Sequence, residues 1–274
     1  MTPVFIFLFG LAVGSFLNVC IHRLPRGSSV IRPRSCCPHC QAPIAPYDNI
    51  PVVSYLLLRG RCRHCRARIA LFYPLVELSA AALLLTLYFQ HGLSPLALKK
   101  ALLGLTLLVL IVTDLRDRLL PDRVTFPALG AGLLFALGVP VDDGTAAWLA
   151  RLAGLELPWQ LLSLGDALLG ASVWAALLYG VGEGFYRLRK IEGLGFGDVK
   201  MVAVLGAYFG LKLTLIAVLL ACLLGIGLGG GFMLLRQKGA RYELPLGSFL
   251  GLAGLAMLFW GPRLLAWYLS LLAV

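Results

Sequence analysis

The sequence predicts an all-α integral membrane protein, on the grounds of its composition and the spacing of its charges. Of its 274 residues, 59% are hydrophobic and only 14% are charged, whereas a soluble globular domain has about 25% charged residues. The charges divide the chain into apolar stretches, most of which approach the roughly 20 residues that a membrane-spanning helix needs. Asp166 is the only charged residue inside any of these stretches. We therefore expect about eight transmembrane helices.

The apolar stretches give the expected order of the elements. They run over Met1 to Ile21, Leu78 to Leu98, Ala101 to Thr113, Val124 to Val141, Leu161 to Gly182, Met201 to Leu211, Leu213 to Leu235 and Leu244 to Pro262. The first stretch has no charged n-region and no small-residue cleavage site, so we expect a retained helix rather than a secretory signal. The expected domains are a first transmembrane helix at 1–21, a cytoplasmic loop domain at 22–73 and a polytopic helical domain at 74–274.

The distribution of lysine and arginine predicts the orientation in the membrane. With the amino terminus outside, four segments face the cytoplasm and carry 18 of the 24 basic residues. These segments are residues 22–73, 114–123, 187–197 and 236–243. The bias follows the positive-inside rule, and it accounts for the net charge of +11 without a nucleic acid partner.

The expected cytoplasmic loop domain carries four cysteines in two CxxC pairs. Cys37 pairs with Cys40 and Cys62 with Cys65, and 21 residues separate the pairs. This spacing is typical of a structural zinc site. Disulfides are the alternative, but thiols on the cytoplasmic side stay reduced. A segment of about fifty residues rarely folds alone, so we expect zinc to stabilise this loop; Cys36 is an alternative ligand to its neighbour.

Two of the expected spans are short, and each adjoins an aspartate. The stretch from Ala101 to Thr113 is followed by Asp114, and the stretch from Met201 to Leu211 is preceded by Asp198. Because a helix rises 1.5 Å per residue, a short span draws its charged neighbours to the membrane boundary. An ionisable residue at membrane depth indicates a functional site. We therefore expect both aspartates to face a cavity at that depth.

Structural roles are the alternative for the carboxylates in these segments. Asp117 lies between two arginines and suits an interfacial ion pair. Asp122 follows Pro121 and precedes an apolar run, as a helix N-cap does. Asp198, in the stretch GLGFGDVK, is also open to the N-cap interpretation. Asp114 has no comparable structural role.

A pair of aspartates at one site has a defined chemistry. Two neighbouring carboxyl groups share one proton, because both cannot be ionised cheaply. One then acts as general base on a water, and the other acts as general acid toward the scissile carbonyl. The glycines of GLGFGDVK would let an extended peptide approach without side-chain obstruction. Asp114 and Asp198 are therefore the candidate catalytic pair of an aspartic protease.

Seven motifs along nearly the whole chain occur in an order that resembles one family. They are GSFLNVCIHRLP, CPHC, NIPVVSYLLLRGRCRHC, YPLVE, TDLRDRLLPD, GFGDVK and LPLGSFLGLAG. The family is that of the bacterial type IV prepilin leader peptidases, which belong with the GxGD intramembrane aspartyl proteases. The resemblance implies a catalytic pair at Asp114 and Asp198. The zinc ligands that it implies are Cys37, Cys40, Cys62 and Cys65.

The resemblance also implies substrates and a methyl donor. The substrates would be prepilins and pseudopilins, cut on the cytoplasmic side of the bacterial inner membrane after a glycine that ends a short basic leader. Many members then methylate the new amino terminus with S-adenosylmethionine, an activity that accompanies the cysteine-bearing loop. Glu77 and the arginines of that loop are candidate contacts for the methyl donor, with anchoring at the membrane interface as the alternative. Lys200 is a candidate to attract substrate carboxyl groups or to influence the pKa of the aspartate pair, with snorkelling at the membrane boundary as the alternative.

Two other classes of function stay open at this point. A proton-coupled transporter would use Asp114 and Asp198 as a proton relay, although no corresponding pair of broken helices is evident. A zinc-dependent enzyme or a DNA-uptake component would use the basic loop, but a four-cysteine zinc site leaves no open position for water. The sequence predicts no particular oligomeric state.

Overall fold

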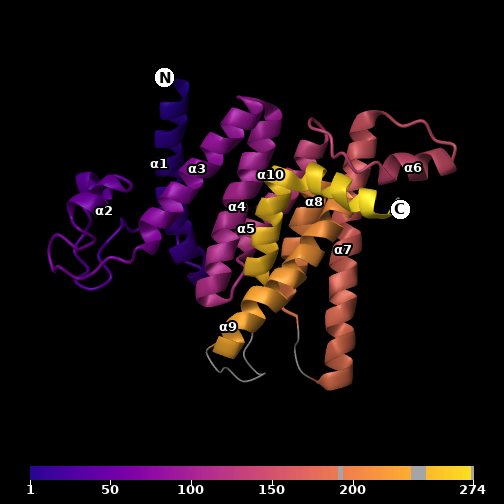
Figure 1. The fold of residues 1–274 in the computed structure, drawn as a ribbon. Helices are drawn as coiled ribbons and strands as arrows, with labels where there is room; N and C mark the ends of the chain where they lie inside the picture. The colour runs from indigo at the N-terminus through magenta and orange to yellow at the C-terminus, as the bar shows by residue number, and fades with distance from the viewer. Residues whose placement is uncertain (191–193, 236–244, 273–274) are drawn as a thin grey trace. The chain divides into compact units, whose positions relative to one another are not determined.

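The computed structural model describes residues 1–190, 194–235 and 245–272, and these residues are mainly helical. Within them the only β-structure is a pair of isolated bridges in the cysteine-bearing loop. The chain divides into two compact units, Met1–Ala101 and Leu102–Val274. Figure 1 shows the elements of both units coloured along the chain. The predicted all-α membrane architecture is confirmed.

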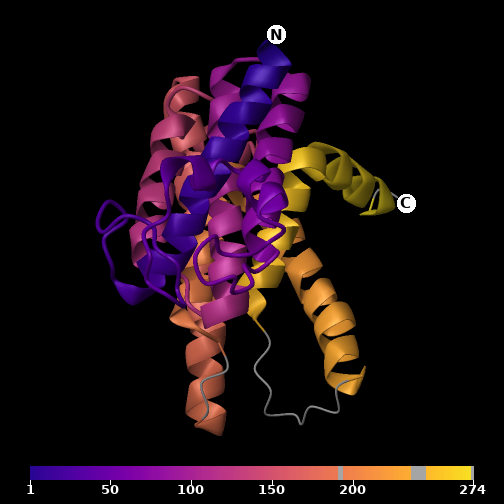
Figure 2. The same ribbon diagram turned by 90° about the vertical axis from the view of Figure 1, so that its left-hand side faces the viewer.

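The first unit consists of two long helices and the loop between them. Its elements are α1 (Thr2–Arg23), η1 (Leu24–Arg26), η2 (Pro46–Asn49), α2 (Val53–Leu57), α3 (Phe72–His91) and the start of α4 (Pro95–Asp117). Helices α1 and α3 pack side by side (Figures 1 and 2). A Cβ atom on Gly10 would lie 2.5 Å from the Cα of Ala81, and one on Gly14 would lie 2.5 Å from the Cα of Glu77. Glycine at these two positions therefore lets the helix backbones touch, as in many membrane helix pairs.

The second unit is built around α8. Its elements after α4 are α5 (Asp122–Ala136), α6 (Thr145–Leu152), α7 (Trp159–Arg189), α8 (Phe196–Leu224), the π-helical η3 (Gly225–Gly229), α9 (Gly230–Leu235) and α10 (Leu246–Leu272). Helix α8 packs against α5, α7 and α10. Its closest approach is to α7, where a Cβ atom on Gly206 would lie 2.3 Å from the carbonyl group of Gly170.

Helix α8 is broken at Gly210, which has φ 75° and ψ −166°. Contacts with α10 define the course of α8 on either side of this break. They are Met201 with Gly251, Leu205 with Gly254 and Leu213 with Gly261, followed by Gly225 with Phe249. The chain therefore advances along α10 up to the break and then returns along it. The sequence boundary expected at Lys212 corresponds to this reversal.

The structure has six helical segments, in its described residues, that are long and apolar enough to cross a membrane. They are Thr2–Arg26, Phe72–His91, Pro95–Asp117, Trp159–Arg189, Phe196–Met233 and Leu246–Tyr268. The expected number of about eight is not confirmed. The segment Phe196–Met233 contains the stretch Met201 to Leu211 and most of the stretch Leu213 to Leu235, with the break at Gly210 close to their boundary, and Val124 to Val141 yields the 15-residue helix α5. At 1.5 Å per residue α5 is about 22 Å long, short of a hydrocarbon core of about 30 Å.

Some of the expectations lie outside the described residues. They concern Gly193 of the glycine-rich stretch, the basic segment 236–243 and Leu244.

Candidate active site

The four cysteines of the two CxxC pairs lie together in the first unit. The sulfur atoms of Cys37, Cys40, Cys62 and Cys65 all lie within 4.8 Å of one another. Cys36 is not part of this cluster, because its thiol is exposed and points to the side-chain oxygen of Gln41 at 3.6 Å. The structure thus gathers Cys37 of the regular CxxC pair with the other three thiols and leaves its neighbour Cys36 outside.

The two CxxC segments have the same backbone conformation. The N–H of Cys37 donates to Ala42 at 3.0 Å and the N–H of Gln41 donates back to Cys37 at 2.9 Å. The corresponding bonds of the second pair, Cys62 with Ala67 and Arg66 with Cys62, measure 2.9 and 3.1 Å. Gln41 and Arg66 both adopt positive φ, 58° and 60°. Sequence inspection missed this local repeat because only the cysteines and their spacing are shared.

The electrostatics of the cluster suit a cation. Backbone N–H groups of Cys40 and His39 point at the sulfur of Cys37 and lower the pKa of that thiol to about 6. The pKa of Cys62 is lowered in the same way. For Cys65 the backbone N–H of Ala67 acts to lower the pKa, but desolvation and the neighbouring sulfurs outweigh it and raise the pKa to about 11. Crowded sulfurs resist full ionisation unless a metal ion neutralises them, and four thiolates are the donor set of structural zinc sites.

Polar contacts fasten the loop around this cluster. Arg63 makes two hydrogen bonds to Asp48, at 2.7 and 2.5 Å, which hold the pKa of that carboxyl below its usual value. Glu77 of α3 is buried and accepts a hydrogen bond of 2.7 Å from the backbone N–H of Val52. Val52 has a positive φ of 61°, a conformation that a β-branched residue rarely adopts. Glu77 thus holds Val52 of the loop against α3.

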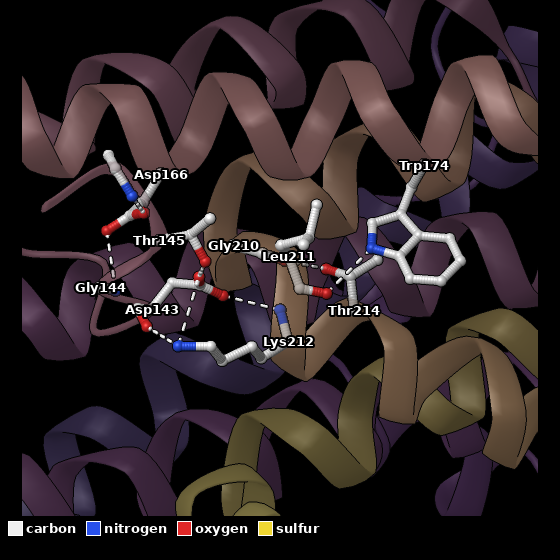
Figure 3. A network of polar contacts seen from close by, with 10 residues as sticks. Asp143, Gly144, Thr145, Asp166, Trp174, Gly210, Leu211, Lys212 and Thr214 are labelled. Carbon is white, nitrogen blue, oxygen red and sulfur yellow. Dashed lines mark hydrogen bonds and ion pairs between the residues drawn. The ribbon is translucent and has the colours of Figure 1, made fainter. Parts of the chain in front are cut away.

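A second polar cluster lies in the second unit, at the break in α8 (Figure 3). The Oδ2 of Asp143 accepts from the backbone N–H of Lys212 at 2.7 Å, and its side chain is fully buried. Two bonds satisfy carbonyl groups at the break: Trp174 donates to Leu211 at 2.9 Å, and Thr214 donates to Gly210 at 2.6 Å. This cluster therefore stabilises the reversal of α8.

Two hydrogen bonds explain why the carboxylate of Asp166 lies in an apolar stretch. Its two carboxylate oxygens accept from the backbone N–H groups of Gly144 at 3.0 Å and Ala146 at 2.7 Å. These groups belong to the start of α6, where the helix itself leaves N–H groups unpaired. Asp166 thus holds α6 against α7 from inside the second unit (Figure 3). It is a structural carboxylate.

The two expected catalytic aspartates come together in the second unit. Asp114 lies in the last turn of α4 and is 6% exposed. Asp198 lies in the first turn of α8 and is partly buried. The two carboxyl groups are near enough for the charge of one to act on the other. The N-cap of α8 is Gly195, with no side-chain capping bond, so Asp198 does not serve as the cap.

Small and apolar residues close the space around the pair. The side chain of Leu120 lies beside both Gly197 and Gly247, where a Cβ atom would be 3.1 and 3.0 Å away from it. A Cβ atom on Gly247 would also lie 3.1 Å from the carboxyl group of Asp114. Glycine at these positions thus brings the starts of α8 and α10 close to the end of α4. These three helix ends can lie close together because no side chain stands at the two glycines.

Ser248, at the start of α10, is a site residue that the sequence did not reveal. Its backbone N–H and its hydroxyl lie 2.5 and 2.7 Å from the same oxygen, Oδ2 of Asp114. The serine is 2% exposed. It stands inside the motif LPLGSFLGLAG, but an isolated serine in an apolar stretch gives no indication of its partner.

The charged residues beside the pair are engaged with each other. Lys200 forms an ion pair with Asp122 and lies over the rings of Phe196 and Phe126, at 5.2 and 5.7 Å. The expectation that Asp122 caps α5 is wrong, because the N-cap is Pro121 and no side-chain capping bond forms. Lys200 compensates the charge of Asp122 in the native structure.

A largely apolar groove of about 200 Å³ is lined on α8 by residues on both sides of Asp198 in the sequence. Its lining consists of Thr125, Phe126 and Leu129 on α5, Ala175 on α7, and Phe196, Val199, Lys200 and Ala203 on α8. The groove therefore lies along the segment that carries one member of the aspartate pair.

These features define a class: a multi-pass helical membrane protein with two carboxylates gathered at helix ends and a four-thiol cluster in a loop. The chain belongs to the type IV leader peptidase family. The model of that family matches residues 101–230, and the model of the bacterial peptidase A24 N-terminal domain matches residues 8–91. No solved structure matches the chain.

Curated relatives cover almost the whole chain. One of them, "Prepilin leader peptidase/N-methyltransferase" of Aeromonas hydrophila, is 38% identical over 97% of this chain and 93% of its own length. Proteins with the same description in Burkholderia pseudomallei strain 1026b and in Pseudomonas aeruginosa are 36% and 35% identical, over 95% and 96% of this chain. These two matches cover 86% and 92% of the relatives' own lengths.

Proposed function

We propose that this chain is a membrane-embedded aspartic endopeptidase that removes the basic leader from prepilins and pseudopilins after a glycine. It then methylates the new amino terminus with S-adenosylmethionine. The observation that carries the proposal is the approach of Asp114 and Asp198 from the ends of α4 and α8. Family membership supports the reaction class, and the relatives' names join both activities in one chain.

The catalytic pair works by sharing a proton. The charge of Asp114 acts on Asp198, and in this mechanism one of them is a carboxylate and the other a carboxylic acid when substrate binds. The carboxylate takes a proton from a water molecule while that water attacks the scissile carbonyl carbon. The carboxylic acid protonates the carbonyl oxygen. The tetrahedral intermediate then collapses, with a proton passing to the leaving amine.

The glycine-bearing start of α8 gives the substrate its approach. Gly195 has an extended backbone, and only 3.3 Å would separate a Cβ atom placed on it from Oδ2 of Asp198. An extended peptide lying against this segment meets no side chain from Gly195 or Gly197. The groove that continues along α8 offers apolar contacts to residues next to the cleaved bond.

The site is placed on the cytoplasmic face of a bacterial inner membrane. The ends of α4 and α8 that carry the pair adjoin Arg116, Arg118 and Lys200. The positive-inside rule therefore assigns this end to the cytoplasm, as it does the cysteine-bearing loop. Prepilin leaders, which are themselves basic and cytoplasmic, would meet the pair there.

Zinc in the loop has a structural role in this proposal. Cys37, Cys40, Cys62 and Cys65 would hold it, and the four sulfurs fill its coordination, so no position is left for water. The zinc-bound loop supports the methyl-transfer activity, for which S-adenosylmethionine supplies the methyl group. No observation favours a proton-coupled transporter.

Product masses test both activities together. The purified protein is incubated in detergent with a prepilin, with and without S-adenosylmethionine. We expect loss of the leader in both reactions and a further gain of one methyl group, about 14 Da, only with the methyl donor. An intact prepilin would refute the peptidase, and a cleaved product without the methyl group would refute the transferase alone.

A further inference from the structure

The contact between Ser248 and Asp114 uses one carboxylate oxygen only. Backbone N–H and side-chain hydroxyl of Ser248 both lie within hydrogen-bond distance of Oδ2, at 2.5 and 2.7 Å. The hydroxyl also lies 3.2 Å from the backbone carbonyl oxygen of Ile111, one turn earlier in α4. The backbone N–H has a further, longer contact of 3.2 Å with Pro245. The short contact at the start of α10 also benefits from the positive end of the helix dipole.

The hydroxyl has two acceptors but only one proton, so its direction depends on the state of Asp114. With Asp114 ionised, the hydroxyl donates to Oδ2. With Asp114 protonated on Oδ1, Oδ2 becomes a neutral and weaker acceptor, and the hydroxyl can turn to the carbonyl of Ile111. The backbone N–H of Ser248 points at Oδ2 and can donate to it in either state. The carboxyl group is therefore held in one position through either state.

We propose that Ser248 is a positioning residue, which fixes Asp114 through Oδ2 while that aspartate gains and loses a proton during catalysis. Oδ1, the oxygen that Ser248 does not engage, is left to face water and substrate. The inference rests on the proposed function, since only an aspartate that changes protonation needs a hydroxyl that can turn between Oδ2 and the carbonyl of Ile111. It adds a third chain segment, α10, to the machinery formed by α4 and α8.

Other charged groups of this region have to be kept constant in a test. The charge of Asp114 acts on Asp198 of α8. Near the pair in the sequence are also Arg116, Asp117 and Arg118 at the end of α4, Asp122 and Arg123 at the start of α5, and Lys200 of α8. Lys200 and Asp122 are paired with each other. Substitution of Ser248 leaves all of these groups in place.

The decisive variant is Ser248→Ala, which removes the hydroxyl and keeps the backbone N–H. A hydrogen bond to a charged group is stronger than one to a neutral group, so loss of the hydroxyl disfavours the ionised state. We expect kcat to fall about tenfold with little change in KM, and the acidic limb of the pH–rate profile to move upward by about half to one pH unit. Ser248→Thr, which keeps a hydroxyl, should restore the limb to its wild-type position.

Ser163→Ala is the matched control. Ser163 is also a buried serine of the second unit, but its hydroxyl accepts from the backbone N–H of Val141 at 2.9 Å. This variant should lose thermal stability without a shift of the pH–rate profile. Ser248→Cys, a weak donor of similar size, gives a second measurement if the alanine variant does not fold, and its limb should shift in the same direction.

An unchanged profile in every folded Ser248 variant would overturn the inference. That outcome is distinct from failure of the proposed function, which would show as a wild-type protein that does not cleave prepilin. A wild-type enzyme that cleaves, together with Ser248→Ala at the wild-type kcat and pH–rate profile, would reject the positioning role alone.

Discussion

At the scale of residues, the two aspartates are held in different ways. Asp114 is buried and fixed by two donors from Ser248, whereas Asp198 is only partly buried and stands in the first turn of α8 behind glycines. A fixed carboxyl beside a less constrained one suits a pair that must admit both a water and a peptide. The cysteine cluster, by contrast, is closed on itself and suits a structural ion.

Zinc content tests the assignment of the four thiols. Replacing Cys37 and Cys62 together by serine removes one ligand from each CxxC segment, so we expect bound zinc to fall from about one ion per chain to nearly none. Leader cleavage should be largely kept. Metal analysis of the purified protein measures the bound zinc, and a gel assay measures leader cleavage.

The neighbouring Cys36→Ser variant is the control, because its thiol contacts Gln41 and lies outside the cluster. It should bind zinc like the wild type. An unchanged zinc-to-protein ratio in the double variant would contradict the site.

The thiols of the metal-free loop should ionise at different pH values. Because the pKa of Cys37 is lowered to about 6 and that of Cys65 is raised to about 11, we expect Cys37 to be a thiolate at neutral pH and Cys65 to keep its proton. In chelator-treated protein we expect alkylation of Cys37 to rise through pH 6 and alkylation of Cys65 to require a strongly alkaline solution. Mass spectrometry of peptides after timed alkylation measures both. Equal reactivity, with a common midpoint near the unperturbed value of about 8.5, would show that the loop does not hold this structure without metal.

At the scale of elements, the reversal of α8 creates the site. A break at Gly210 turns the chain back along α10, and the first segment, from Phe196, is left short. A short segment draws its charged first turn toward the membrane boundary, and there we expect Asp198 to lie. Asp143, Trp174 and Thr214 satisfy the groups that the break exposes (Figure 3).

Packing of α8 against α7 should tolerate no side chain at Gly206. In Gly206→Ala the new methyl group would meet the backbone of Gly170 at 2.3 Å, so the helices must separate. Overpacking of this kind costs about 1 to 3 kcal/mol. We expect a lower midpoint of thermal unfolding in detergent and reduced cleavage.

Gly180→Ala, on α7, provides the comparison. No atom lies within 4 Å of a Cβ at Gly180, so this variant should be as stable as the wild type or slightly more stable, since alanine favours helix. Equal stability of the two variants would show that the close contact of α7 and α8 is absent.

At the scale of the whole molecule, local sequence patterns predict which residues are candidates for the site, but they do not predict how the fold brings these residues together. The all-α class, the cysteine cluster and both aspartates follow from composition, spacing and short apolar stretches. The hydrogen-bond partner of Asp114 does not follow from such patterns, because Ser248 lies 134 residues away in the chain. The neighbouring residues of Asp122 predict a helix cap, yet Asp122 forms an ion pair with Lys200, which lies 78 residues further along the chain.

The expected number of about eight spans is not confirmed, and α8 shows why local patterns do not decide it. Lys212 separates two apolar stretches in the sequence, but none of the 31 glycines is marked out as the residue where the helix breaks, which is Gly210. Gly210 has a positive φ, and a Cβ atom on it would lie 2.7 Å from the side chain of Asp143. Hydropathy alone therefore counts stretches, whereas packing decides which of them become separate crossings.

The most direct test of the central claim is leader cleavage by three Asp→Asn variants, each checked for folding by its thermal midpoint in detergent. Asp114→Asn and Asp198→Asn should each lose at least about a hundredfold in rate, because an amide can neither accept nor supply the proton. Asp166→Asn, a buried carboxylate that only binds backbone N–H groups, should be less stable but still cleave. Cleavage at the wild-type rate by a folded Asp114→Asn or Asp198→Asn protein would contradict the account.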